Sequence, residues 1–135
     1  CLVAIIDADT NHLTMGNAGQ CFPFLVRAGS AKELSLIGRP LGTKSAEPAS
    51  SAEWSLQPGD VVVFFTDGLV EAMDIDGKQI GYERFQAALP GLIGIDASAT
   101  RRAIHDWHHS MTRPGPADDD ITLVVLQNQD SEITI

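Results

Sequence analysis

The sequence predicts an α+β fold, in which strands dominate the first half of the chain and helices follow them. Two observations predict it: short apolar stretches separated by turn residues run as far as Phe65, and helical spacing of apolar residues begins only near Tyr82. A third is the apolar stretch ITLVVL at 121–126, which comes after the helical region. Strands and helices therefore do not alternate as they do in a parallel βαβ fold.

The expected strands are apolar or alternating stretches bounded by turn residues. They cover residues 2–6, 12–19, 21–27, 34–37, 52–57 and 61–66. The first two form a hairpin, with Asp7, Asp9 and Asn11 in its turn. Residues 28–33 (AGSAKE) are expected to be a turn, and 58–60 (PGD) form a tight turn before the most apolar of these strands.

Two helices are expected after a loop that follows Asp67 and contains a turn at 74–77. The first begins near Tyr82 and ends or kinks at 90–91 (PG), because proline interrupts a helix. The second runs from Ser98 to about Met111, with Asp96 or Ser98 as its cap. The final stretch, 121–126, is almost continuously apolar, which predicts a central strand covered on both faces.

Length, charge and cysteine content narrow the function. The 135 residues suit one domain, 1–135, or a large piece of one. The net charge of −9 argues against binding nucleic acid or anionic membranes, and no apolar run is long enough to cross a bilayer. Two cysteines give no disulfide framework, so we expect a cytoplasmic protein. The chain starts with Cys1 inside an apolar stretch, so we expect residues upstream of it.

Two acidic spots carry the functional hypothesis. Asp67 emerges from the buried strand VVVFF at 61–65, and Gly68 after it permits close backbone approach. Asp119 lies in the acidic run 118–120 just before the last strand, where neighbouring like charges are relieved by a cation or by solvent. If the two strands are neighbours, their carboxylates converge and suit Mg²⁺ or Mn²⁺ in a phosphoester-cleaving site. Taken alone, Asp67 is better explained as a strand-end residue that caps the next turn, and the acidic run at 118–120 is compatible with a solvated loop, which is common.

The order of several short motifs resembles the metal-dependent PPM-type (protein phosphatase 2C-like) phosphatases, and more closely their bacterial SpoIIE/RsbU branch. These motifs are MGNAGQCFPFLV, GRPLG, LQPGDVVVFFTDGLVEA, DIDGKQIG and DDDITLVVL. The resemblance covers the chain from about Ala4 to Leu126. It implies an antiparallel β-sandwich flanked by helices (a four-layer αββα fold), of which this chain is the C-terminal part, incomplete at the N-terminus.

The resemblance also implies an activity and a site. The family removes phosphate from phosphoserine or phosphothreonine on regulatory proteins, often anti-sigma-factor antagonists, using two Mn²⁺ or Mg²⁺ ions and a metal-activated water. On the matching positions, Asp67 and Asp119 would be metal ligands. The supporting residues would be Gly68, Asp120, Thr122, Asn17 and Gly19. The implied partner is a phosphorylated regulatory protein, and a homodimer is left open.

The sequence departs from the family pattern in two places. No earlier strand here ends in the Asp-Gly motif that supplies a carboxylate shared by both metals, and Asp7 falls in the hairpin turn instead. Gln20 stands where the branch usually has histidine, so this side chain can hydrogen-bond but cannot titrate. The alternative function is therefore a catalytically inactive PPM-fold module that regulates by binding a partner protein.

Other signals are weaker. Cys21 and Arg27 have the C-x₅-R spacing of cysteine phosphatases, but the segment between them reads as a strand instead of a phosphate-binding loop. The DIDG stretch at 74–77 lacks the later ligands of an EF-hand. Three histidines at 105, 108 and 109 share helical spacing, and a partly exposed helix face explains them better than a zinc site. Glu71 suits a supporting or a surface role equally.

Overall fold

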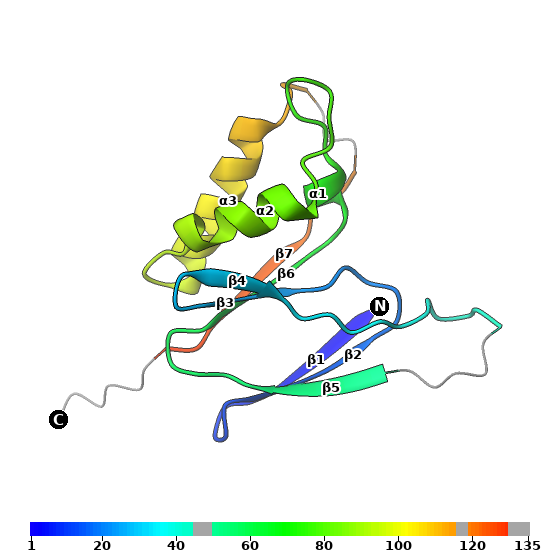
Figure 1. Ribbon diagram of the computed structural model, residues 1–135, viewed down its shortest axis with the longest axis vertical. Helices are drawn as coiled ribbons and strands as arrows, with labels where there is room; N and C mark the ends of the chain where they lie inside the picture. The colour runs from blue at the N-terminus through cyan, green and yellow to red at the C-terminus, as the bar shows by residue number, and fades with distance from the viewer. Residues whose placement is uncertain (45–49, 116–118, 130–135) are drawn as a thin grey trace.

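The computed structural model describes residues 1–44, 50–115 and 119–129. Two antiparallel sheets pack face to face, and helices cover one of them (Figure 1). The three-stranded sheet has the order β1-β2-β5, with bounds Leu2–Asp7, His12–Asn17 and Ser50–Ser55. The four-stranded sheet has the order β4-β3-β6-β7, with bounds Ser30–Glu33, Phe24–Arg27, Val61–Phe65 and Leu123–Gln127. The expected α+β sandwich is confirmed.

The helices follow β6 and pack on the four-stranded sheet. They are α1 (Gly68–Glu71), α2 (Tyr82–Ala88), the 3₁₀ turn η1 (Leu89–Leu92) and α3 (Ala97–Met111). The expected helices are α2 and α3, and Asp96 caps α3 by accepting a hydrogen bond from the Ala99 N–H at 2.6 Å. Helix α1 was expected to be loop; it is a single turn that Asp67 caps. In the described part of the chain the outer face of the three-stranded sheet carries no helix (Figure 1).

Strand β6 contributes side chains to both faces of the four-stranded sheet, so this sheet is buried on both sides. Its alternate side chains Val61, Val63 and Phe65 join the core under the helices, whereas Val62 joins the core between the two sheets. Successive side chains of a strand point to opposite faces, so one apolar run serves two cores. A rigid, doubly buried strand therefore leads directly to Asp67.

Three expectations about strands and turns are wrong. Residues 34–37 are not a strand: Leu34 and Leu36 enter the core between the sheets, but the segment belongs to no strand in the described part of the chain. Residues 28–33 are not a turn, because Ala28 and Gly29 alone turn the chain, with φ of 48° and 74°, and β4 pairs with β3 from Ser30 onward. Strand β7 is not central: within the described residues it pairs only with β6, and Val124 is 54% exposed. An apolar run shows that a strand is covered somewhere but not which neighbour covers it.

Candidate functional site

The ends of β6 and β7 bring the two acidic spots to one edge of the sheet. The strands are antiparallel neighbours, with Phe65 opposite Leu123. The residues that follow β6 therefore lie beside the residues that precede β7. This places Asp67 and Asp119 on adjoining loops.

Thr66 ties these two loops together. Its hydroxyl donates to the Asp120 carbonyl at 3.2 Å and accepts the Thr122 N–H at 2.9 Å. The Thr66 N–H also donates to the Thr122 carbonyl at 3.1 Å. We call this set of three hydrogen bonds the Thr66 clamp. It fixes the backbone on both sides of the candidate site.

Gly68 allows the close approach that its place in the sequence predicts. A Cβ atom at this position would lie 2.6 Å from the Asp120 carbonyl oxygen, which is closer than real Cβ contacts. Gly68 is buried, and its N–H donates to Asp67 Oδ1 at 3.1 Å. The two acidic loops are thus in direct backbone contact at Gly68, and any larger residue would force them apart.

Both candidate carboxylates are exposed at this edge. Asp119 Oδ1 accepts the Asp120 N–H at 2.7 Å, as Asp67 Oδ1 does with Gly68, and within the described residues the second oxygen of each carboxylate stays open. Such oxygens are the hard ligands that Mg²⁺ and Mn²⁺ prefer. No group of three or more His, Cys, Asp or Glu side chains gathers anywhere in the described residues. The donors therefore have the right chemistry, and the set is partial.

Asn17 and Gly19 shape a turn that follows the three-stranded sheet's strand β2. The buried Asn17 side chain donates to the Gln20 carbonyl at 2.9 Å and accepts the Gln20 N–H at 2.8 Å. Gly19 has φ of 79°, and a Cβ there would lie 2.6 Å from the Pro40 ring. The Gln20 amide in turn reaches the Phe65 carbonyl at 3.5 Å, next to the Thr66 clamp. These residues shape the turn that borders the site.

Cys21 and Arg27 do not form a cysteine phosphatase site. Arg27 makes two hydrogen bonds to the buried Asp60 carboxylate, at 2.8 and 2.5 Å, at the far end of β3. The Cys21 sulfur instead accepts a hydrogen bond from the Tyr82 hydroxyl at 3.2 Å. Burial raises the pKa of Tyr82, and Cys21 and the charges of Asp67 and Glu71 raise it further. Glu71 itself is exposed.

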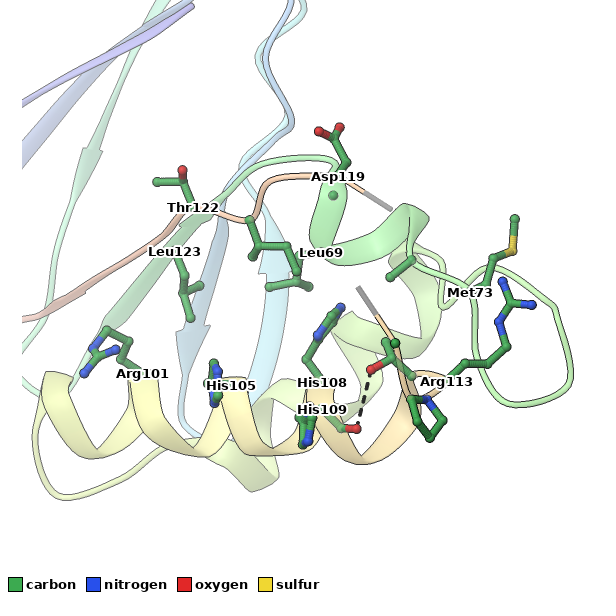
Figure 2. A pocket seen from close by; sticks show the side chains of 16 residues that line it. Leu69, Met73, Arg101, His105, His108, His109, Arg113, Asp119, Thr122 and Leu123 are labelled. Atoms are coloured by element: carbon green, nitrogen blue, oxygen red, sulfur yellow. Dashed lines mark hydrogen bonds between the residues drawn. The ribbon is translucent and has the colours of Figure 1, made fainter. Parts of the chain in front are cut away.

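A pocket of about 800 Å³ opens beside Gly68 and Asp119, between α3 and the start of β7. Figure 2 shows Arg101, His105 and His109 along α3 on one wall, with the Asp119 carboxylate directed away from them. His105 and His109 stack with centroids 6.4 Å apart, and His108 instead turns toward α1 (Figure 2). The three histidines therefore do not converge on one point, as a zinc site requires.

His108 is the most enclosed of these side chains. Burial lowers its pKa, repulsion from His105 and His109 lowers it further, and the Leu69 backbone acts in the opposite direction. Its Nε2 atom is buried and has no hydrogen-bond partner in the described part of the chain. The enclosure of His108 and the Thr66 clamp were not anticipated, because contacts between distant segments create both. In the sequence, only the four-residue spacing of Arg101, His105 and His109 indicates that these side chains share one wall of the pocket.

A family model agrees with this geometry over almost the whole chain. The model, described as stage II sporulation protein E (SpoIIE), matches residues 1–129. The chain belongs to the SpoIIE family. A comparison with curated protein sequences returns no match.

Solved structures share the fold of this SpoIIE-family chain. The SpoIIE phosphatase domain from Bacillus subtilis matches with a TM-score of 0.76 and 18% identity, over 97% of this chain and 59% of that one. The SiaA-PP2C domain of Pseudomonas aeruginosa matches with a TM-score of 0.80 and 20% identity, over 93% and 50%. The RsbU and RsbW domains of a Mycobacterium tuberculosis protein match with 0.75 and 24%, over 95% and 36%. The chain thus spans little more than half of these structures at most.

Proposed function

We propose that the protein containing this chain hydrolyses phosphoserine or phosphothreonine on a regulatory protein, with Mn²⁺ or Mg²⁺ held in part by Asp67 and Asp119. One observation carries the proposal: the Thr66 clamp and the Gly68 contact hold two exposed carboxylates on adjoining loops of neighbouring strands. Membership of the SpoIIE family supports it. A structure of the B. subtilis SpoIIE phosphatase domain described as Mn presoaked is a further match, at 19% identity.

Each residue has a separate part in this proposal. Asp67 and Asp119 bind the ions through their open oxygens, and Thr122 and the Asp120 carbonyl position the loop that carries Asp119. Asn17 and Gly19 shape the neighbouring turn. Bound ions supply positive charge for the phosphoryl oxygens and an activated water. The carboxylate needed to complete the set would come from the part of the domain that the longer relatives have and this chain does not span.

The regulatory partner is the finer part of the proposal. One matched structure contains an RsbU and an RsbW domain in the same protein, which associates this phosphatase type with a second regulatory domain there. For the present chain, the described residues include no helix long and apolar enough to cross a membrane. The RsbU and RsbW domains in that relative make a phosphorylated regulatory protein the substrate class to test first.

The test is hydrolysis of a phosphoserine protein by the complete natural protein, with and without Mn²⁺. We expect Asp67→Asn and Asp119→Asn each to lower kcat/KM by at least about 100-fold, since even residues that only support metal ligands cost about 10- to 100-fold. Asp9→Asn, an exposed carboxylate in the β1–β2 turn, is the matched control and keeps activity. Activity that survives Asp67→Asn would contradict the metal assignment.

A second candidate function is a module that keeps the fold and acts by binding a partner without turnover. Gln20, which stands where a titratable histidine is usual in the branch, favours it, because an amide can hydrogen-bond but cannot titrate. The same experiment separates the two functions. A complete natural protein that binds its phosphorylated partner but shows no Mn²⁺-dependent hydrolysis would be the binding module.

A further inference from the structure

The pocket beside Asp119 gathers basic side chains in an acidic protein. The chain has a net charge of −9 with nine Lys and Arg residues and four His. Two of those nine, Arg101 and Arg113, and three of the four histidines line this one pocket. Positive charge gathered in a concave site raises the local concentration of an anionic ligand, and here the two arginines supply it.

The two arginines of the pocket differ from those that stabilise the fold. Arg27 and Arg84 bind the buried carboxylates of Asp60 and Asp74. Within the described residues no carboxylate pairs with Arg101 or Arg113, both of which are exposed at the pocket. Among the described residues, Asp119 is the one acidic residue that lines this pocket, and Figure 2 shows its carboxylate directed away from α3. The guanidinium groups are thus available to an anion from outside.

The basic residues form a ladder along one helix. Arg101, His105 and His109 recur every fourth residue of α3, which places them on one face. The ladder spans about 12 Å at ~1.5 Å per residue. An extended peptide advances about 3.3 Å per residue, so three or four of its residues match that length. The ladder therefore suits a peptide segment better than a single small ion.

We propose that this pocket binds the acidic side chains that flank the phosphorylated residue of a protein substrate. Its border with Gly68 and Asp119 places the pocket next to the candidate phosphate-cleaving site. The phosphorylated residue would lie at the two carboxylates, and Asp or Glu residues three or four positions away would lie along the ladder. The proposal deepens the proposed function and rests on it. It adds the substrate class, namely a phosphoserine or phosphothreonine in an acidic segment.

The test compares two phosphoserine peptides that differ only in flanking residues, three Glu in one and three Gln in the other. The complete natural protein with Mn²⁺ is expected to favour the acidic peptide in kcat/KM, and an Arg101→Gln/Arg113→Gln double variant is expected to lower this ratio roughly 5- to 10-fold, mainly through KM. Using the ratio within each protein cancels a general loss of activity. Arg102→Gln is the matched control, because Arg102 is on the same helix and bonds Ser98 outside the pocket.

Each possible result either supports or overturns the docking proposal. A ratio near one in the natural protein, or an unchanged ratio in the double variant, overturns the docking proposal. If the double variant does not fold, the natural protein alone tests the proposal, because its preference for the acidic peptide must fall as the ionic strength rises. If no peptide is hydrolysed, the proposed function fails separately, and fluorescence anisotropy of the labelled acidic peptide then tests docking. Binding that the double variant loses supports the pocket, and absence of binding overturns it.

Discussion

Thr66 shows how one hydroxyl can control the geometry of a site that it does not belong to. It lies between the buried strand and Asp67, and its two side-chain hydrogen bonds reach across to the loop that carries Asp119. The side chain is therefore a positioning residue. Its contribution is the relative placement of the two loops that carry Asp67 and Asp119.

Replacing Thr66 tests that role directly. We expect Thr66→Val to lower the free energy of unfolding by about 0.5–1.5 kcal/mol, because the Thr122 N–H loses its acceptor and the Asp120 carbonyl loses its donor. We also expect Mn²⁺ to bind more weakly, which titration calorimetry on the complete protein measures. Thr66→Ser keeps the hydroxyl and should retain both properties. Equal behaviour of the two variants would exclude the clamp.

Ala28 is a residue in an unfavourable conformation. Its φ of 48° lies in the left-handed region, which suits Gly, Asn and Asp better than Ala. We expect Ala28→Asn to raise the free energy of unfolding by about 0.5–1 kcal/mol, because Asn-Gly is the preferred pair for a two-residue hairpin turn. Urea denaturation measures the change. A decrease in stability would mean that the turn between β3 and β4 has another conformation.

At the scale of elements, a carboxylate fastens the turn between α1 and α2 to the helix that follows it. Asp74 is buried and accepts the backbone N–H groups of Asp76 and Lys78, and the Arg84 guanidinium binds it at 2.8 Å. The hydrogen bond from Lys78 lowers the pKa of Asp74 most, followed by the one from Arg84. The ionised form therefore stabilises this turn and its attachment to α2.

The pH dependence of stability follows from that shift. Because the pKa of Asp74 is lowered in the folded state, its stabilisation is fully present above the usual carboxyl range and is lost as the pH falls below about 4. We expect Arg84→Gln to be less stable than the natural protein at pH 7, with the difference shrinking toward pH 3. Urea unfolding at several pH values measures this. Arg102→Gln should show no such convergence, and a constant difference for Arg84→Gln would contradict the mechanism.

At the scale of the whole molecule, the sequence predicted the elements that depend on local patterns. It did not predict features that depend on contacts between distant segments. Apolar runs and turn residues located β6, α2 and α3, because periodicity and capping act within a few residues. The β3–β4 hairpin was misplaced because the expected turn at 28–33 is too long, whereas Ala28 and Gly29 alone turn the chain. The edge position of β7 was missed because an apolar run does not identify the neighbours of a strand.

The candidate site was likewise predictable only where its residues form a local pattern. Asp67, Asp119 and Gly68 were identifiable from strand ends and a glycine, and the structure places their loops side by side. Their role as metal ligands stays a prediction. The Thr66 clamp depends on contacts between residues more than fifty positions apart. The basic pocket depends on the packing of α3 beside the start of β7. No local pattern encodes such contacts.

The two cores that share β6 each have one tryptophan packed against them, so each core has its own fluorescent reporter. Of its two tryptophans, Trp107 packs against the core under the helices and Trp54 against the core between the sheets. Their emission therefore monitors the two layers of packing independently in Trp54→Phe and Trp107→Phe proteins. Coincident denaturation curves would show that the shared strand couples both layers into one cooperative unit, and separated curves would show that either layer can melt while the other persists.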